Sequence, residues 1–335
     1  MVSKAHALVQ RPKQKPRNKD GLPVHSPSDN TVGGTDLSPP VNTFHLELFH
    51  HFITNVSNSL GFDKSSFENS AFDMTKCALT APFLMNQVLA FAALHLSIIR
   101  PEKQEFYRNH ASQLQTHALS EFNEAKLDIN PDTCLPMFLF SSVLAMHVLS
   151  DKLLYRPHAF EVFLDDFIQS LRMHHGVRAI TGQSWNLLLE SPLKSFLEGE
   201  GKALEQAPSG TECSELLSHV EAMPFDPSIR DTYRKAINDL QKAFDASRTP
   251  SLKLSTIGPI IFWPVTITPT YIDLLSERRS EALAILSHFG VLIHSHRDLW
   301  IFGNSGLYII SAINDYLGPA WKDWLHYPNS FIYNM

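Results

Sequence analysis

The sequence predicts an all-α protein, a multi-helix array around a hydrophobic core or pocket with a disordered N-terminal tail. Hydrophobic residues occupy 44% of the 335 positions and charged residues 19%, which is enough apolar material to bury a large core. From Phe44 onward, apolar residues recur at the three- and four-residue spacings of helices. Neither convincing strand alternation nor an internal repeat is visible.

The first 42 residues have the composition of a tail that does not fold. They contain no aromatic residue, hold six basic residues between Lys4 and Lys19, and continue into a mixture of Pro, Ser, Gly and Asp. Such a segment cannot bury enough apolar area to offset the entropy lost on ordering. We therefore expect a disordered, solvated tail over residues 1–42 and an all-helical domain over residues 43–335. The basic stretch also fits a nuclear localisation signal or a weak nucleic-acid contact.

Helical periodicity in the first half of that domain indicates five helices. The second is buried on most sides and has a proline in its first turn, whereas the third has one apolar and one polar face. The fourth is apolar nearly all round, and the fifth carries a single apolar stripe. In chain order, the first helix begins at Phe44. The next four run from Thr80 through Leu94, from Tyr107 to Ala125, from Leu135 to Leu149, and from Phe160 to Gly176, where the last one is expected to end.

The second half is expected to contain further helices separated by loops. The segment Glu198–Glu212, rich in Gly, Glu and Ser, predicts a surface loop, and Ile257–Pro264 contains one glycine and two prolines, too many for a regular helix. Thr268 provides an N-cap, with Pro269 in the first turn. The remaining helical patterns are Trp185–Glu190, Glu215–Ala222, Ser228–Ala246, Thr268 to about Glu277, Ser280–His296, and Leu307–Leu317, which Gly318-Pro319 ends.

Charge and cysteine content argue against several classes of protein. The chain has 28 Lys and Arg against 34 Asp and Glu, a formal charge of −6. A phosphate-binding surface needs clustered positive charge, so the whole chain is not expected to bind nucleic acid directly and sequence-specifically. The three cysteines, Cys77, Cys134 and Cys213, are too few and too scattered for a disulfide framework or a multi-cysteine metal cluster, and they fit a reducing compartment.

No targeting segment is evident in the sequence. The longest apolar runs, Phe83–Ile99 and Leu135–Leu149, are shorter than the about 18–20 residues of a membrane span. Polar residues such as Gln87, His95 and His147 interrupt them. We expect no transmembrane segment and a location in the nucleus or cytoplasm.

The 17 histidines do not predict a metal site. His50-His51 and His174-His175 are direct neighbours, and His294 and His296 are two residues apart. Two ligands on one helix face need a spacing of three or four residues, because closer neighbours point in different directions. We therefore expect hydrogen-bonded core or surface histidines, no metal and no cofactor.

Asp165-Asp166 is the nearest approach to a magnesium site. All-α enzymes that act on prenyl diphosphates hold Mg²⁺ with carboxylates one helical turn apart, but position 169 is Gln and both aspartates fall outside the apolar stripe of their helix. We expect them to be solvated. The segment Gly303–Gly306 has a serine between glycines, yet it lacks the spacing and the strand of a nucleophile elbow. No phosphate-binding glycine loop is present, and the catalytic residues, if any, stay unknown.

The best candidate for a ligand pocket lies near the C-terminus. Apolar residues from Leu283 to Ile293 repeat at spacings of three and four, and two aromatic residues follow directly, so this segment is expected at the centre of the fold. Close packing explains most of these side chains. If the segment lines a cavity, the expected lining residues are Leu286, Phe289, Ile293, Trp300 and Phe302.

Blocks of the folded part also occur in the order found in a known family. They are His45–Phe52, Pro82–Met85 with Leu89–Leu96, Leu171–Arg178, Glu277–Leu283, Arg297–Gly303, Tyr316–Trp321 and Trp324–Pro328. Together they resemble the regulatory domain of fungal zinc-cluster transcription factors of the sterol uptake control type, over about residues 44–328. The resemblance implies an all-helical, often dimeric domain with a hydrophobic pocket that senses sterols or other lipophilic metabolites.

One departure from the family changes the expected function. Members normally carry an N-terminal zinc cluster built on six cysteines, whereas no cysteine precedes Cys77 here. The resemblance then implies a regulator-like protein that binds a sterol- or isoprenoid-like molecule and acts as a homodimer or as a heterodimer with a DNA-binding relative, with secondary metabolism as one setting. An alternative is a domain recruited as a biosynthetic enzyme, such as a terpene cyclase that acts on a prenyl diphosphate with Mg²⁺. A plain interaction scaffold is the third reading, and we favour the regulator over both.

Overall fold

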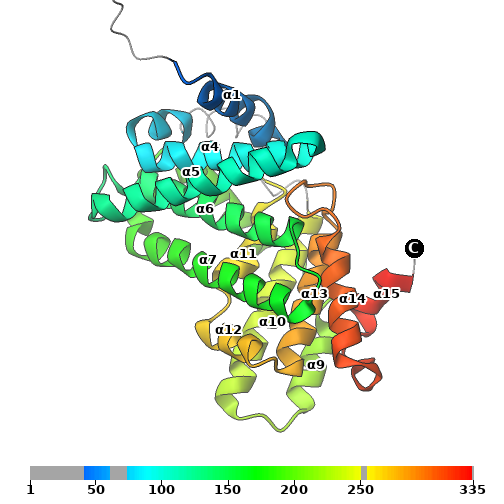
Figure 1. The fold of residues 1–335 in the computed structure, drawn as a ribbon. Helices are drawn as coiled ribbons and strands as arrows, with labels where there is room; N and C mark the ends of the chain where they lie inside the picture. Colours follow the sequence, from blue (N-terminus) through cyan, green and yellow to red (C-terminus); the bar gives the residue numbers. More distant parts are fainter. Residues whose placement is uncertain (1–40, 61–73, 250–254, 334–335) are drawn as a thin grey trace, which may run out of the picture. The chain divides into compact units, whose positions relative to one another are not determined.

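Helices account for the regular secondary structure of this protein, and no β-strand occurs among the residues that its computed structural model describes, which are 41–60, 74–249 and 255–333 (Figure 1). The predicted all-α class is confirmed. Residues 42–335 form one compact unit. The predicted tail lies outside the described residues except for Val41 and Asn42, so the boundary between residues 42 and 43 stays a prediction.

The helices follow one another with short connections. Residues 74–80 are also helical. In chain order the elements are α1 (Thr43–His51), the π-helix η1 (Phe52–Val56), α2 (Ser57–Ser59), α4 (Pro82–Ile99), η2 (Pro101–Lys103), α5 (Gln104–Ala125), α6 (Cys134–Leu154), α7 (Phe160–Leu189), α8 (Lys194–Gln206), α9 (Ser214–Ala222), α10 (Pro227–Arg248), α11 (Gly258–Thr266), α12 (Pro269–Ser276), α13 (Ser280–His294), α14 (Ser305–Leu317), η3 (Pro319–Trp321) and α15 (His326–Tyr333).

Local sequence explains where several helices begin. The Asn42 side chain accepts a hydrogen bond from the His45 amide at 3.0 Å and caps α1. Pro82 occupies the first turn of α4, where a backbone donor is not needed. The predicted Thr268 cap is confirmed, since its hydroxyl accepts from the Tyr271 amide at 3.1 Å. These caps fix the ends of helices that packing then stabilises.

Helices α4 and α13 each pack against several other helices. In the first half of the domain, α4 packs against α1, α5 and α6, and α6 packs in turn against α7 (Figure 1). In the second half, α13 packs against α14, α10 and α12, and its residues from Ala282 to Ile293 are all buried. The predicted central position of this segment is confirmed.

The crossing of α13 and α14 depends on two glycines. A Cβ atom on Gly306 would overlap the backbone of Gly290 and His294, and one on Gly290 would lie 3.1 Å from the side chains of Ile309 and Ile310. Backbone atoms cannot move aside as a flexible side chain can. The two helices therefore approach closely only because both positions lack a side chain.

Three sequence predictions about helix boundaries are wrong. Helix α7 continues through Gly176 to Leu189, because one glycine inside a helix costs only about 1 kcal/mol and packing outweighs it. Helix α8 occupies most of the segment predicted as the loop Glu198–Glu212. Helix α11 forms despite its prolines, because Pro259 lies in the first turn and Pro264 removes only one helical hydrogen bond.

Two helices, α4 and α6, are long and apolar enough to cross a membrane by length and composition. In the most apolar 18-residue stretch of each helix, 72% of the residues of α4 and 56% of those of α6 are buried inside the protein. Core helices have the same properties, so these two segments are weak evidence for membrane spans.

Candidate functional site

A stripe of polar and aromatic residues runs along the otherwise apolar helix α4. Gln87, Phe91 and His95 are spaced by four residues and therefore lie on one face of the helix. All three are buried, and Gln87 has no solvent exposure at all. Burial of an amide and an imidazole in an apolar helix is costly unless they are hydrogen-bonded, which makes their partners informative.

His95 links α4 to α1 and to the turn after α13. Its Nδ1 atom lies 3.1 Å from Nε2 of His51, which is also buried. The His95 ring stacks on Trp300, with centroids 4.6 Å apart and planes 27° apart. Trp300 also contacts the ring of Phe91 at 5.2 Å. Residues from three distant parts of the chain therefore meet along α4.

Gln87 links α4 to α6. Its Nε2 atom lies 3.2 Å from Nδ1 of His147, whose ring is 6.1 Å from that of Phe91. Because an amide nitrogen can only donate, Nδ1 of His147 accepts, and this neutral imidazole carries its proton on Nε2. We call the whole set the α4 stripe; it consists of His51, Gln87, Phe91, His95, His147 and Trp300.

The histidines of the α4 stripe are uncharged at neutral pH. Burial lowers the pKa of His95 and that of His147 to about 4. Burial, followed by the positive charge of Arg100, also lowers the pKa of His51. The stripe thus offers hydrogen-bonding groups without a net charge.

Two buried polar atoms of the α4 stripe have no hydrogen-bond partner among the described residues. They are Oε1 of Gln87, an acceptor, and Nε1 of Trp300, a donor. Leaving a buried polar atom unpaired costs about 1–3 kcal/mol. Other buried side-chain atoms of the described residues, such as Nε2 of Gln115 and Oγ of Ser287, are unpaired as well. The two atoms of the stripe differ from these in that both belong to side chains next to Phe91.

An ion pair beside the α4 stripe ties α1 to the end of α4. Nη1 of Arg100 lies 2.6 Å from Oε1 of Glu47, and Arg100 also bonds the hydroxyl of Tyr107 on α5. Both charged side chains are more than a third exposed, so the pair itself adds little stability. After burial, the positive charge of Arg100 contributes to the lowered pKa of His51, whereas the negative charge of Glu47 acts in the opposite direction.

The predicted pocket residues occupy two different surroundings. Leu286, Phe289, Ile293 and Phe302 are fully buried, and the ring of Phe289 stacks on Trp263 at 4.5 Å. Trp300 instead belongs to the α4 stripe and is half-buried. Whether these five residues line one cavity stays a prediction. In the sequence, Gln87, His95 and His147 stand out only as polar interruptions of apolar runs. The two successive four-residue steps, from Gln87 to Phe91 and from Phe91 to His95, are the signal that could have found the stripe.

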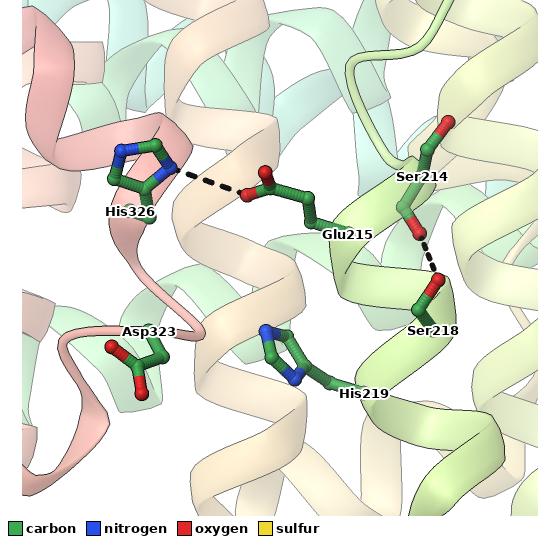
Figure 2. A pocket seen from close by; sticks show the side chains of 6 residues that line it. All are labelled: Ser214, Glu215, Ser218, His219, Asp323 and His326. Atoms are coloured by element: carbon green, nitrogen blue, oxygen red, sulfur yellow. Dashed lines mark hydrogen bonds and ion pairs between the residues drawn. The ribbon is translucent and has the colours of Figure 1, made fainter.

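A hollow of about 490 Å³ lies between α9 and the segment before α15 (Figure 2). Nδ1 of His326 and Oε2 of Glu215 are 3.2 Å apart across it, and both side chains are more than 60% exposed. His219 lies against Trp324 with ring centroids 5.1 Å apart. The hollow is open to solvent, so it cannot enclose a lipophilic molecule. Its lining residues are Ser214, Glu215, Ser218, His219, Asp323 and His326.

The acidic pair on α7 is arranged in separate ion pairs. Oδ1 of Asp165 lies 2.6 Å from Arg278, and Oδ2 of Asp166 lies 3.3 Å from Lys152. Each carboxylate is thus directed at a basic side chain on a different element. Within the described part of the chain, no three His, Cys, Asp or Glu side chains are grouped so that they could hold a metal ion.

The remaining sequence candidates are structural. Nδ1 of His288 and of His296 each donates to a backbone carbonyl at 2.9 Å, as expected of hydrogen-bonded histidines. The buried hydroxyl of Ser305 donates to the Leu153 carbonyl and accepts from Arg156, both at 2.8 Å. The side chain of His175 lies outside the described residues.

Similarity to three known proteins indicates the class of protein to which this chain is related. A Zn(2)-C6 fungal-type transcription factor of Gibberella zeae is 21% identical over 326 residues, which are 91% of this chain and 63% of that protein. A Zn(2)-C6 fungal-type transcription factor, afumD, of Aspergillus fumigatus is 24% identical over 75% of this chain and 68% of its own length.

The third relative is sterol uptake control protein 2 of Candida albicans, 29% identical over 133 residues, which are 39% of this chain and 18% of that protein. The chain therefore spans only part of the length of these relatives. No family model matches it. The chain is a homologue of fungal Zn(2)-C6 transcription factors, consistent with a regulatory domain, and the homology supports a transcription-regulator-like role.

Proposed function

We propose that this chain is a ligand-sensing regulatory domain that binds a lipophilic, sterol- or isoprenoid-like molecule and controls transcription. The observation that carries the proposal is the α4 stripe. In it, the acceptor Oε1 of Gln87 and the donor Nε1 of Trp300 are buried next to apolar side chains without a hydrogen-bond partner. Pockets for lipophilic ligands combine such an apolar lining with a few polar groups. The relatives give the regulatory context, since their names describe transcription factors and one describes sterol uptake control.

The proposal includes a partner that reads DNA. The chain has three cysteines, too few for the six-cysteine zinc cluster of the resembling family, and its formal charge is −6. The proposal places sequence-specific binding to DNA outside these 335 residues, for example in a second protein that joins the chain in a heterodimer or that recruits a homodimer of it. A nuclear location and a role in secondary metabolism fit this arrangement.

An enzymatic function gains no support from the residues described. A cyclase of the prenyl-diphosphate type would need carboxylates free to hold Mg²⁺, whereas Asp165 and Asp166 are engaged with Arg278 and Lys152. No other observation favours this alternative over ligand sensing.

Equilibrium binding to the purified full-length chain tests the proposal. A fluorescent sterol and a fluorescent prenyl alcohol are titrated with the chain, and displacement by unlabelled lipophile is recorded. We expect saturable, displaceable binding of at least one probe by the folded protein. Absence of saturable binding of both probes to a chain with native circular dichroism would contradict the proposal.

A further inference from the structure

The α4 stripe places its two unpaired polar atoms at different heights along the helix. Gln87 and Phe91 are one helical turn apart, and Trp300 contacts both Phe91 and His95, which is one turn further on. With a rise of 1.5 Å per residue, the Cα atom of Gln87 lies roughly 6 Å from that of Phe91 and roughly 12 Å from that of His95 along the helix axis. A ligand with polar groups at two separate positions fits this arrangement better than one with a single hydroxyl group.

The unpaired atoms also differ in what they require. Oε1 of Gln87 needs a donor, while Nε1 of Trp300 needs an acceptor. The other amide atom of Gln87, Nε2, lies 3.2 Å from Nδ1 of His147. His51 and His95 form a hydrogen bond with each other. Between Gln87 and His95 on α4, the stripe contains only the apolar ring of Phe91.

The charges around the stripe define the ligand further. His51, His95 and His147 are neutral, and the nearby Arg100 is already paired with Glu47. Burying an anionic group here without a counter-charge would be costly. Carboxylates and diphosphates are therefore poor ligands for this stripe.

We propose that the α4 stripe binds an uncharged lipophile with two polar groups, a donor that bonds Gln87 Oε1 and, roughly one to two helical turns away, an acceptor that bonds Trp300 Nε1. The inference rests on the proposed ligand-sensing function and narrows its ligand to a doubly oxygenated class. A lipophile with one oxygen satisfies one atom and leaves the other unpaired.

A matched steroid series tests this inference by displacement of the fluorescent probes from the full-length chain. The series keeps one skeleton and carries a 3-hydroxyl only, a 3-hydroxyl with a 17-ketone, or a 3-hydroxyl with a 17-carboxylate. We expect the hydroxy-ketone to bind about 10-fold more tightly than the mono-alcohol, because one hydrogen bond to a buried polar atom is gained. It should also bind about 10-fold more tightly than the acid, because the carboxylate would be buried without a counter-charge. Equal affinities for all three would overturn the inference.

Two variants with matched controls identify the atoms. Gln87→Met keeps the length of the side chain and removes both amide atoms, including the donor to His147, whereas Trp300→Phe removes Nε1 and leaves a smaller ring. Each variant should weaken hydroxy-ketone binding about 10-fold. Gln115→Met on α5, where Nε2 is also buried and unpaired, and Trp185→Phe, at a residue 42% exposed, should leave affinity unchanged.

The outcomes separate this inference from the proposed function. Saturable probe binding that neither Gln87→Met nor Trp300→Phe affects would overturn the α4 stripe as the site and leave ligand sensing intact. If Gln87→Met fails to fold, Trp300→Phe and the wild-type steroid series decide the question on their own. Failure of the wild type to bind any lipophile would instead contradict the proposed function itself.

Discussion

Three buried histidines show how a single side chain can link folding to pH. Burial lowers the pKa of His95, His147 and His288 to about 4, from 6.5. Each is therefore neutral in the folded protein, while the unfolded chain binds a proton below about pH 6.5. The unfolded state gains protons that the folded state excludes, so stability decreases as pH falls.

We predict that the free energy of unfolding is constant from about pH 8 to 7 and falls between pH 6.5 and about 4. The slope should approach about 1.4 kcal/mol per pH unit for each histidine. Urea unfolding at pH 7.5, 6.5, 5.5 and 4.5 measures it, and His95→Gln should reduce the slope. Hydrogen bonds from Arg234 and from Ser228 lower the pKa of Glu221 from 4.5 and that of Asp226 from 3.8, so these two carboxylates add to the loss of stability only near and below the lower end of this window. A stability independent of pH above 4.5 would contradict the prediction.

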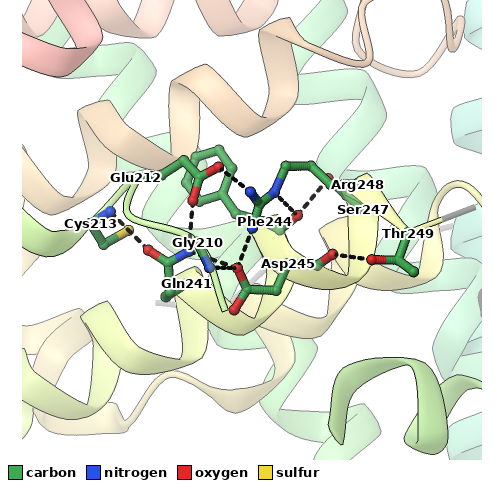
Figure 3. A network of polar contacts seen from close by, with 9 residues as sticks. All are labelled: Gly210, Glu212, Cys213, Gln241, Phe244, Asp245, Ser247, Arg248 and Thr249. Atoms are coloured by element: carbon green, nitrogen blue, oxygen red, sulfur yellow. Dashed lines mark hydrogen bonds and ion pairs between the residues drawn. The ribbon is translucent and has the colours of Figure 1, made fainter. Parts of the chain in front are cut away.

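A second feature at this scale is the buried carboxylate Asp245 (Figure 3). It accepts hydrogen bonds from the Gly210 amide at 2.8 Å, from Gln241 at 2.8 Å and from Arg248 at 2.5 Å. Gln241 also accepts from the Cys213 amide at 2.9 Å. The network fastens the connection between α8 and α9 to α10.

Asp245→Ala should lower the free energy of unfolding by about 1–3 kcal/mol, since it removes the acceptor of the partly buried Gly210 amide. Gln241 and Arg248 each lose one bond but keep Glu212 as a second partner. Asp231→Ala is the control, because Asp231 is 69% exposed and its pair with Arg234 is solvated; its effect should stay below about 1 kcal/mol. Chemical denaturation of both variants provides the comparison. Equal losses in the two variants would show that the network adds nothing to stability.

At the scale of helices, the close crossing of α13 and α14 leads to a sharp prediction. Gly306→Ala should destabilise the protein by about 2 kcal/mol or more, because its Cβ would overlap backbone that cannot move independently. Gly201→Ala in α8 is the control: no atom lies within 4 Å of the added Cβ, and alanine should stabilise this helix by about 0.5–1 kcal/mol. Thermal unfolding distinguishes the two, and an unchanged midpoint for Gly306→Ala would refute the account of the crossing.

The helices also show how far the sequence could predict the fold. Periodicity located α4, α5, α6, α10 and α13 because each buries a regular apolar face. Local signals misled at Gly176 and in Gly258–Thr266, where tertiary packing outweighs the cost of glycine and proline. Helix α15 was not predicted, since it follows Pro319 and two tryptophans without a clear period.

The candidate site was less predictable than the helices. Only Trp300 of the α4 stripe is among the pocket residues that the sequence indicates. The contacts of Gln87 with His147, 60 residues away, and of His95 with His51, 44 residues away, depend on which helix faces meet. A single sequence contains the spacing within α4 but not the pairing of α4 with α6 and α1.

At the scale of the whole molecule, we predict that the tail is dispensable for folding. A chain without residues 1–40 keeps Asn42, the residue that caps α1, and loses no aromatic residue. Its thermal midpoint should match that of the full-length chain within about 1 °C, as expected where no apolar surface is lost. A fall of several degrees would show that the tail contributes to the fold.

The chain alone should also lack specific affinity for duplex DNA. Its charge of −6 and its three cysteines give it neither a phosphate-binding surface nor a six-cysteine zinc cluster. Weak shifts in a mobility assay that disappear with salt are expected from the basic residues between Lys4 and Lys19. A footprint that survives high salt would contradict this prediction.

A tethered reporter tests the central claim, regulation of transcription by a lipophile, most directly. The full-length chain is fused to a heterologous DNA-binding domain in yeast, and reporter output is followed while sterol and isoprenoid synthesis is blocked and then restored by feeding. We expect output to change on depletion and to recover on feeding, with Gln87→Met blunting the response and Gln115→Met leaving it intact. An output that stays constant through depletion and feeding, from a fusion that is expressed and nuclear, would contradict the account.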